Sequence, residues 1–184
     1  MFGRLFRRDP ESEAIASALY GAIVAQARLP ALYAGFGVAD TVDGRFEMIV
    51  LHAILVIDRL RAGGAAEQAV GQRVFDLFCT DMDRSLRELG VGDLGVPKRM
   101  RKMTERFYGR AEAYREALGP RDSATLAAAY ERNVFNRATP SAGPLAAYAL
   151  ASFDALAADP PGALMTGPPP FADPIAFVPE GVVA

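Results

Sequence analysis

The sequence predicts an all-α protein: a single compact bundle of about six helices, followed by an extended, proline-rich C-terminal tail. Apolar residues recur at spacings of three and four through most of the first 158 positions. Glycine and proline separate these periodic segments, and no convincing stretch alternates with the period of a strand. Seven of the chain's 13 prolines lie in the segment 160–179, too densely for a helix. We therefore expect a helical domain over residues 1–158 and a tail over 159–184.

The first helix is expected over about residues 9–28. It opens with Asp-Pro, which supplies a cap and then a proline at the first helical position. Pro30 ends it, because proline cannot continue a helix in that position. Residues 32–36 are expected to form a short helix or turn.

The second helix is expected over about residues 44–62. Thr41 or Asp43 is placed to cap it, and Gly63-Gly64 is a stop signal. Between the charged residues at its two ends, apolar side chains occupy most of its circumference. Such a pattern is typical of a central helix, or of one that has two covered faces.

Four more helices follow from the same reasoning. Residues 66–89 carry one narrow apolar face and stop at Gly90. Proline opens the segment 97–118, whose apolar positions again have helical spacing. Two alanine-rich segments, 122–137 and 142–158, complete the bundle.

The tail after residue 158 lacks the spacing of a helix or a strand. It carries four large apolar side chains, and two outcomes are open: an extended disordered segment, or a strap that docks on the bundle. The residues available for docking are Phe171, Ile175, Phe177 and Val178.

The composition excludes several classes of function. The formal net charge is −2, so the chain as a whole lacks the basic character of nucleic-acid-binding proteins. Its one cysteine, Cys79, cannot form an intramolecular disulfide or a zinc finger, and one histidine, His52, makes a histidine-based catalytic centre improbable. We expect no cofactor and no metal site.

No segment is expected to cross a membrane or direct secretion. The longest apolar run, residues 48–57, covers about half of the ~20 residues that a bilayer requires. The first eight residues, MFGRLFRR, are interrupted by charge at once and do not resemble a signal peptide. As a short amphipathic basic segment they are suited to weak attachment to an anionic membrane surface. The expected location is cytoplasmic, in contact with the inner membrane at most.

A basic stripe is predicted on the helix over residues 97–118. Four cations follow one another at spacings of three, four and four, which places them on one helical face. They are Arg99, Lys102, Arg106 and Arg110. Such a stripe suits an acidic partner, RNA phosphates or anionic lipid headgroups, and its alternative is a solvated helix face.

The histidine belongs to a second predicted stripe. Arg45, His52 and Arg59 are seven residues apart on the second helix, as are Asp76 and Asp83 on the third. In an antiparallel hairpin about Gly63-Gly64 the paired positions have a constant sum. This register pairs Arg59 with Asp76 and His52 with Asp83, along an edge that could face a partner.

Two long segments resemble the ubiquinol–cytochrome c chaperone family: GVADTVDGRFEMIVLHAILVIDRLR and VFDLFCTDMDRSLRELGVGDLGVPKRMRKMTERFYGRAEAY. The resemblance covers about residues 31–118, and DTVDGRFEM and FYGRAEAY are among its most specific parts. It implies a helical, non-enzymatic assembly factor of the cytochrome bc1 complex. Its client would be newly made cytochrome b, a transmembrane protein, and mitochondrial members act near the ribosome with a small partner protein.

Two other functions stay open on the residues alone. One is a ligand-binding protein or enzyme with a site between the second and third helices, around His52 and Asp83. The other is an RNA-binding module, which rests on the basic stripe alone.

Overall fold

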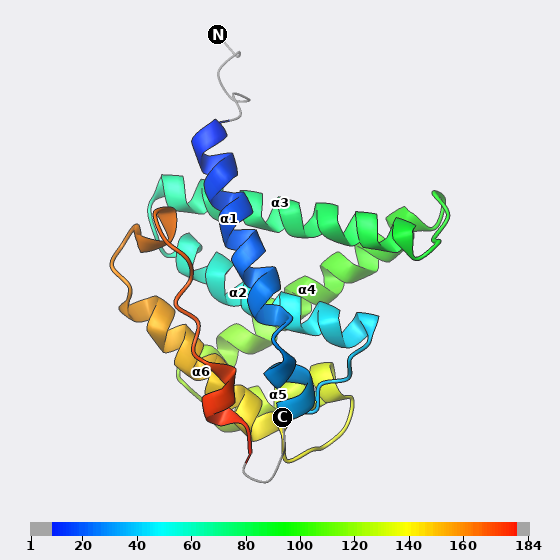
Figure 1. The fold of residues 1–184 in the computed structure, drawn as a ribbon, viewed down its shortest axis with the longest axis vertical. Coiled ribbons are helices and arrows are strands. Elements are labelled where there is room, and N and C mark those ends of the chain that lie inside the picture. Colours follow the sequence, from blue (N-terminus) through cyan, green and yellow to red (C-terminus); the bar gives the residue numbers. More distant parts are fainter. Residues whose placement is uncertain (1–8, 180–184) are drawn as a thin grey trace.

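The structure, a computed structural model, describes residues 9–179, and six α-helices form its framework (Figure 1). They are α1 (Pro10–Ala27), α2 (Val42–Arg61), α3 (Ala65–Glu88), α4 (Val96–Leu118), α5 (Ser123–Tyr130) and α6 (Ala142–Ala158). Four short helical turns are η1 (Ala31–Gly35), η2 (Glu131–Phe135), η3 (Ala163–Met165) and η4 (Pro174–Phe177). The part of the chain that the structure describes contains no strand. The predicted all-α bundle is confirmed.

The helix starts use the capping chemistry that the sequence predicts. The Asp9 carboxylate accepts from the Glu11 amide at 3.2 Å, with Pro10 in the first turn. At the start of α2 the Thr41 hydroxyl accepts from the Gly44 amide at 3.2 Å. Thr41 is therefore the cap, and Asp43, the other candidate, lies inside the first turn of α2.

Helix α2 is the central element of the bundle. It packs against α1, α3, α4 and α6 and lies in the middle of the molecule (Figure 1). Every residue from position 46 to position 57 is buried, including Glu47 and His52. The predicted central helix is confirmed. Its side chains are covered over this stretch, so α2 presents no extended exposed apolar face.

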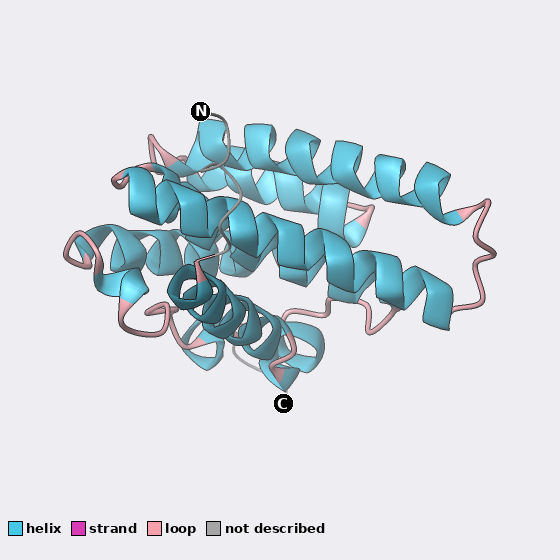
Figure 2. Cartoon of the chain, turned by 90° about the horizontal axis from the view of Figure 1, so that it is seen from above, coloured by secondary structure: helices cyan, strands magenta, loops and turns pink. Residues whose placement is uncertain are grey.

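Helices α3 and α4 form a hairpin whose connecting loop stands at one end of the molecule. The two views, which differ by a quarter turn, agree on this position (Figures 1 and 2). At the other end of α3 the helix approaches α2 closely. A Cβ atom on Gly71 would lie 3.3 Å from that of Leu60, so glycine lets the two backbones meet.

The fifth predicted helix is less regular than expected. Helix α5 ends at Tyr130, and the chain continues as the wider turn η2 up to Phe135. The wider turn brings Val134 onto the buried side, where it is 7% exposed. Asn136 then ends the segment in a left-handed conformation with φ of 54°.

The tail docks on the bundle over the described residues. After α6 it returns alongside that helix toward η1 (Figure 1). Phe171, Phe177 and Val178 pack against the core, whereas Ile175 remains 66% exposed. Val178 sits so close to Gly35 that a Cβ there would lie 2.5 Å from its side chain. Of the two outcomes open for the tail, docking on the bundle is the one observed. Ile175 takes no part in the docking.

Candidate functional site

His52 does not lie on an exposed edge of the α2–α3 hairpin. Its side chain is fully buried, with Nδ1 2.7 Å from the Met48 carbonyl oxygen and Nε2 2.6 Å from the Tyr148 hydroxyl of α6. The ring also meets the edge of Phe171 from the tail, at a centroid distance of 5.1 Å. His52 therefore connects α2 to α6 and the tail. It lies on the side of α2 that is turned away from Asp83, its predicted partner on α3.

The hydrogen bonds fix the protonation of this histidine. Burial lowers the pKa of His52 to about 4, so the ring is neutral at neutral pH. The Met48 carbonyl can only accept, so Nδ1 carries the proton and Nε2 accepts from the Tyr148 hydroxyl. Tyr148 in turn accepts from the Gln26 amide at 3.0 Å, and burial raises its pKa to about 12. With both ring nitrogens bonded, His52 has no nitrogen available for a substrate.

The other members of the predicted His52 stripe are also separated from their expected partners. Arg59 donates from Nε to the Leu156 carbonyl at 2.8 Å, which satisfies the last turn of α6. Asp76 accepts from Gln72, and Asp83 pairs with Arg87 at 2.7 Å.

The predicted pairs Arg59–Asp76 and His52–Asp83 are therefore wrong. A constant sum of positions fixes the register of a hairpin, but not which face each helix turns toward the other. Because α2 is surrounded by helices, its 52/59 stripe faces α6 instead of α3. Arg45, the third member, pairs at the surface with Asp40 at 2.6 Å.

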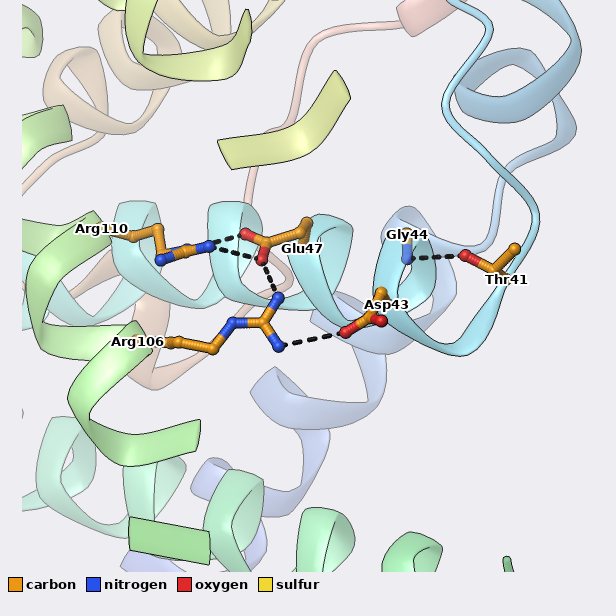
Figure 3. Close-up of polar contacts among 6 residues, drawn as sticks. All are labelled: Thr41, Asp43, Gly44, Glu47, Arg106 and Arg110. Atoms are coloured by element: carbon orange, nitrogen blue, oxygen red, sulfur yellow. Dashed lines mark hydrogen bonds and ion pairs between the residues drawn. The ribbon is translucent and has the colours of Figure 1, made fainter. Parts of the chain in front are cut away.

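A buried carboxylate organises the contact between α2 and α4 (Figure 3). Glu47 is 2% exposed and accepts from two Arg110 nitrogens, Nε at 3.0 Å and Nη2 at 2.9 Å. It also accepts from Arg106 at 2.7 Å, and Arg106 reaches Asp43 at 3.0 Å with its other nitrogen. Two arginines of the predicted basic stripe are therefore used in ion pairs within the fold, Arg110 at 16% exposure and Arg106 at 36%.

The same cluster explains the motif DTVDGRFEM as a structural junction. Thr41 caps α2, and Gly44 lies so close to the preceding loop that a Cβ would fall 1.9 Å from the Ala39 carbonyl oxygen. The Arg106 guanidinium also lies 4.8 Å from the centroid of the Phe46 ring. Sequence reasoning missed Glu47. The signal available was the matched spacing of Asp43 and Glu47 with Arg106 and Arg110, four residues in each case.

The remaining two members of the basic stripe behave differently. Arg99 and Lys102 are exposed, and neither forms an ion pair with any residue in the described range 9–179. They lie in the first two turns of α4, next to the loop that ends the α3–α4 hairpin. The stripe is thus divided into an internal half and an open half.

An apolar cleft lies where the start of α2, the end of α3 and the early part of α4 meet. It has a volume of about 280 Å³. Two of its apolar residues, Val42 and Leu89, are 60% and 56% exposed. The apolar lining consists of Val42, Phe46, Ile49, Met82, Leu86, Leu89 and Met103. Charged side chains of both signs complete the lining, among them Arg28, Arg45 and Glu88.

This cleft suits the binding of a chain segment better than a chemical reaction. Methionine adapts its shape to different apolar partners, and the cleft contains two of them. Within residues 9–179 no three histidine, cysteine, aspartate or glutamate side chains converge to hold a metal ion.

The helices in that same part of the chain are all too short or too polar to span a bilayer. The basic segment MFGRLFRR lies outside the described residues.

The fold and this surface together define the class: an all-α bundle with a buried central helix and an apolar surface cleft. The profile of the ubiquinol-cytochrome C chaperone family matches residues 34–171. The chain belongs to this family. The match reaches well beyond the segment 31–118 and includes α5, α6 and part of the tail, which sequence reasoning had placed outside the resemblance.

Two known proteins are similar to this chain. The crystal structure of the Cbp3 homolog from Brucella abortus superposes with a TM-score of 0.84 and is 43% identical, covering 95% of this chain and 98% of that one. Ubiquinol-cytochrome-c reductase complex assembly factor 1 from Xenopus laevis is 28% identical over 98 residues. That match covers 53% of this chain and 48% of the relative, so the chain spans about half the length of the curated relative it matches.

Proposed function

We propose that this protein is an assembly chaperone of ubiquinol–cytochrome c reductase that binds newly made cytochrome b, from a cytoplasmic position beside the inner membrane. The family membership and the role named for the Xenopus relative support the assembly function. The client is the finer part of the proposal and rests on the chemistry of the cleft.

The observation that carries the proposal is the apolar cleft between α2, α3 and α4. A newly made membrane protein exposes apolar helices that need cover in water. The cleft presents Leu89 and Val42 at more than half exposure and continues inward to Met82 and Met103. Its volume fits a few apolar side chains, and it lies below the usual range for pockets that enclose a whole small ligand.

The enzyme alternative finds less support in the same region. It required a polar pocket containing His52 and Asp83. Both ring nitrogens of His52 are bonded internally, and Asp83 pairs with Arg87 at the surface of α3. The lining of the apolar cleft contains neither His52 nor Asp83.

Photo-crosslinking in cells tests the client. A photoreactive amino acid replaces Leu89 in the cleft in one strain and Ile175 in another. Ile175 is a matched control, because it is an exposed apolar residue on η4 that does not line the cleft. We expect newly made cytochrome b to be captured from position 89 and not from position 175. Capture from both positions alike, or from neither, would contradict a client site in the cleft.

Complementation of a deletion strain tests the role in assembly. The deletion should lower the spectral signal of assembled cytochrome b and leave other respiratory complexes in place. The wild-type gene should restore that signal, Leu89→Glu should restore it poorly, and Ile175→Glu should restore it fully. Normal cytochrome b in the deletion strain would rule out the assembly function itself.

A further inference from the structure

We propose that the tip of the α3–α4 hairpin docks on an anionic lipid bilayer, with Leu94 inserted among the lipids and Lys98, Arg99 and Lys102 at the headgroups. This surface is separate from the cleft, and the inference does not depend on the identity of the client. It assigns a partner to the open half of the basic stripe.

The tip is placed to reach a flat surface before the rest of the protein. It forms one end of the molecule in both views (Figures 1 and 2). The Gly92 carbonyl accepts from the amides of Gly95 at 2.7 Å and Val96 at 3.2 Å, so residues 92–95 form a tight turn. Leu94 occupies this turn and is 100% exposed. No part of the described fold buries the Leu94 side chain, so it is available to insert into the apolar interior of a bilayer.

The charge around Leu94 has the sign that attracts anionic lipid. Residues 87–102 contain five cations and two carboxylates, within a chain of net charge −2. Both carboxylates already have cationic partners: Asp93 pairs with Arg87, and Glu88 pairs with Arg84. Arg101 is matched by Glu105 at 2.9 Å. Lys98, Arg99 and Lys102 are left without an ion-pair partner among residues 9–179.

These three cations do not stabilise α4, so helix stability does not explain why they are there. They lie in its first two turns, where the helix dipole favours negative side chains. The first turn of α4 contains no acidic residue, and its cap, Gly95, offers no side chain. Positive charge is therefore placed where it slightly disfavours the helix, as expected if an external anion compensates for it.

Lipid fits the tip better than RNA does. Proteins that hold single-stranded RNA combine cations with aromatic side chains on which bases stack. Residues 89–102 contain no aromatic residue, and the side chain they present most fully is a leucine. An apolar residue between cations is the arrangement that peripheral proteins use at the boundary between headgroups and acyl chains.

Vesicle flotation with the full-length protein tests this inference. Vesicles of phosphatidylcholine alone are compared with vesicles in which one third is phosphatidylglycerol. We expect binding to the anionic vesicles that weakens with salt. The triple variant Lys98→Ser/Arg99→Ser/Lys102→Ser should lose affinity by about 100-fold, since each cation near such a surface contributes about fivefold. Leu94→Ser should lose about tenfold.

Three controls make the test specific to the tip. Arg61, Arg132 and Arg137 are exposed arginines elsewhere on the protein, so a triple serine variant matches the loss of charge and should bind normally. Ile175→Ser matches the loss of an exposed apolar residue and should also bind normally. Arg4→Ser/Arg7→Ser/Arg8→Ser isolates the basic N-terminal segment, and most of the affinity should remain.

A second measurement reports insertion directly. In a Cys79→Ala background, Leu94→Cys is labelled with a polarity-sensitive dye, and Ile175→Cys serves as the control. The dye at position 94 should shift to the blue with anionic vesicles and not with neutral ones, and the dye at 175 should not respond.

Several results would overturn the inference. They are equal binding to neutral vesicles, equal loss in the matched arginine variant, complete loss in the N-terminal variant, and an unresponsive dye at position 94. Binding to ribosomal RNA without binding to vesicles would also do so and would assign the stripe to RNA. None of these results bears on capture of the client from position 89, so the two proposals fail separately.

Discussion

Helix α4 contains two sets of cations that look alike in the sequence and differ in the protein. Arg106 and Arg110 point at the buried Glu47 of α2 and hold the two helices together (Figure 3). Arg99 and Lys102 continue the same predicted stripe one to three turns earlier, where α4 has left the bundle as part of the hairpin. The spacing is the same in both sets, so the difference depends on which residues lie opposite that part of the helix.

This comparison shows that a charged stripe is not yet a surface for partners. An arginine beside a buried carboxylate cannot be removed without leaving that charge uncompensated, so its first role is structural. A cation in the open part of the same helix stabilises nothing within the fold. The two halves should therefore respond in opposite ways to substitution, and four predictions test this, from the largest expected effect to the smallest.

Substitution of Glu47 should have the largest effect on stability. Glu47→Gln leaves Arg110, which is 16% exposed, facing a neutral amide, and we expect the free energy of unfolding to fall by about 3 kcal/mol. Urea denaturation followed by circular dichroism measures this. Glu105→Gln is the matched control, because its pair with Arg101 is exposed, and it should change stability by at most about 0.5 kcal/mol. Equal losses in the two variants would remove the distinction between the halves.

The second prediction concerns a buried polar group whose partners are neutral. Burial lowers the pKa of His52 to about 4, against a value near 6.5 in the unfolded chain. Between these values the unfolded state binds the extra proton, so stability is complete above pH 6.5 and falls as pH decreases toward 4. We expect a loss of about 2 kcal/mol between pH 7 and pH 5.

Urea denaturation at several pH values measures this loss. His52 is the only histidine in the chain, so no other imidazole contributes in this range. The variant His52→Gln should be less stable overall, with little dependence on pH between 7 and 5. A wild-type protein equally stable at both pH values would show that the histidine is accessible to protons in the folded state.

A half-exposed ion pair should fall between the two extremes. Arg115 of α4 makes two hydrogen bonds to Asp58 of α2, at 2.7 and 2.6 Å, and its side chain is 39% exposed. Arg115→Gln should lower stability by about 1 kcal/mol, with an effect that shrinks in high salt. Arg121→Gln breaks a more exposed pair with Asp154 and should cost less when measured in the same way.

The smallest effect is expected at the open half of the stripe. Lys98→Ser/Arg99→Ser/Lys102→Ser removes positive charge from the start of α4, and the helix dipole predicts a slight gain of up to about 0.5 kcal/mol at low salt. Thermal unfolding at low and high salt measures it. A loss of more than about 1 kcal/mol would mean that these cations have a partner within the protein.

The helices could be predicted almost completely, because their signals are local. Asp9, Thr41 and Asp122 bond the first amides of α1, α2 and α5. Gly63-Gly64 and Gly90 follow the ends of α2 and α3, and Gly90 adopts the left-handed conformation, with φ of 78°, that glycine favours at this position. The wider turn η2, which follows α5 and buries Val134, has no such local signal in the sequence.

The site could be predicted only in part. The chemistry of the stripe on α4 was visible in its spacing, as was the central position of α2. The direction in which each face points was not visible. His52 was expected to face α3 and faces α6, and the cleft is formed by residues from three helices whose approach no local pattern records.

By itself, the sequence determined that this protein is a helical bundle with a covered central helix, because periodicity and capping are properties of neighbouring residues. Only the tertiary structure decided which polar residues are used inside. Glu47 and His52 are buried because α4 and α6 bring them partners, and a buried polar group without a partner would destabilise the fold. The same packing leaves Leu94 and three cations outside, at the tip of the α3–α4 hairpin.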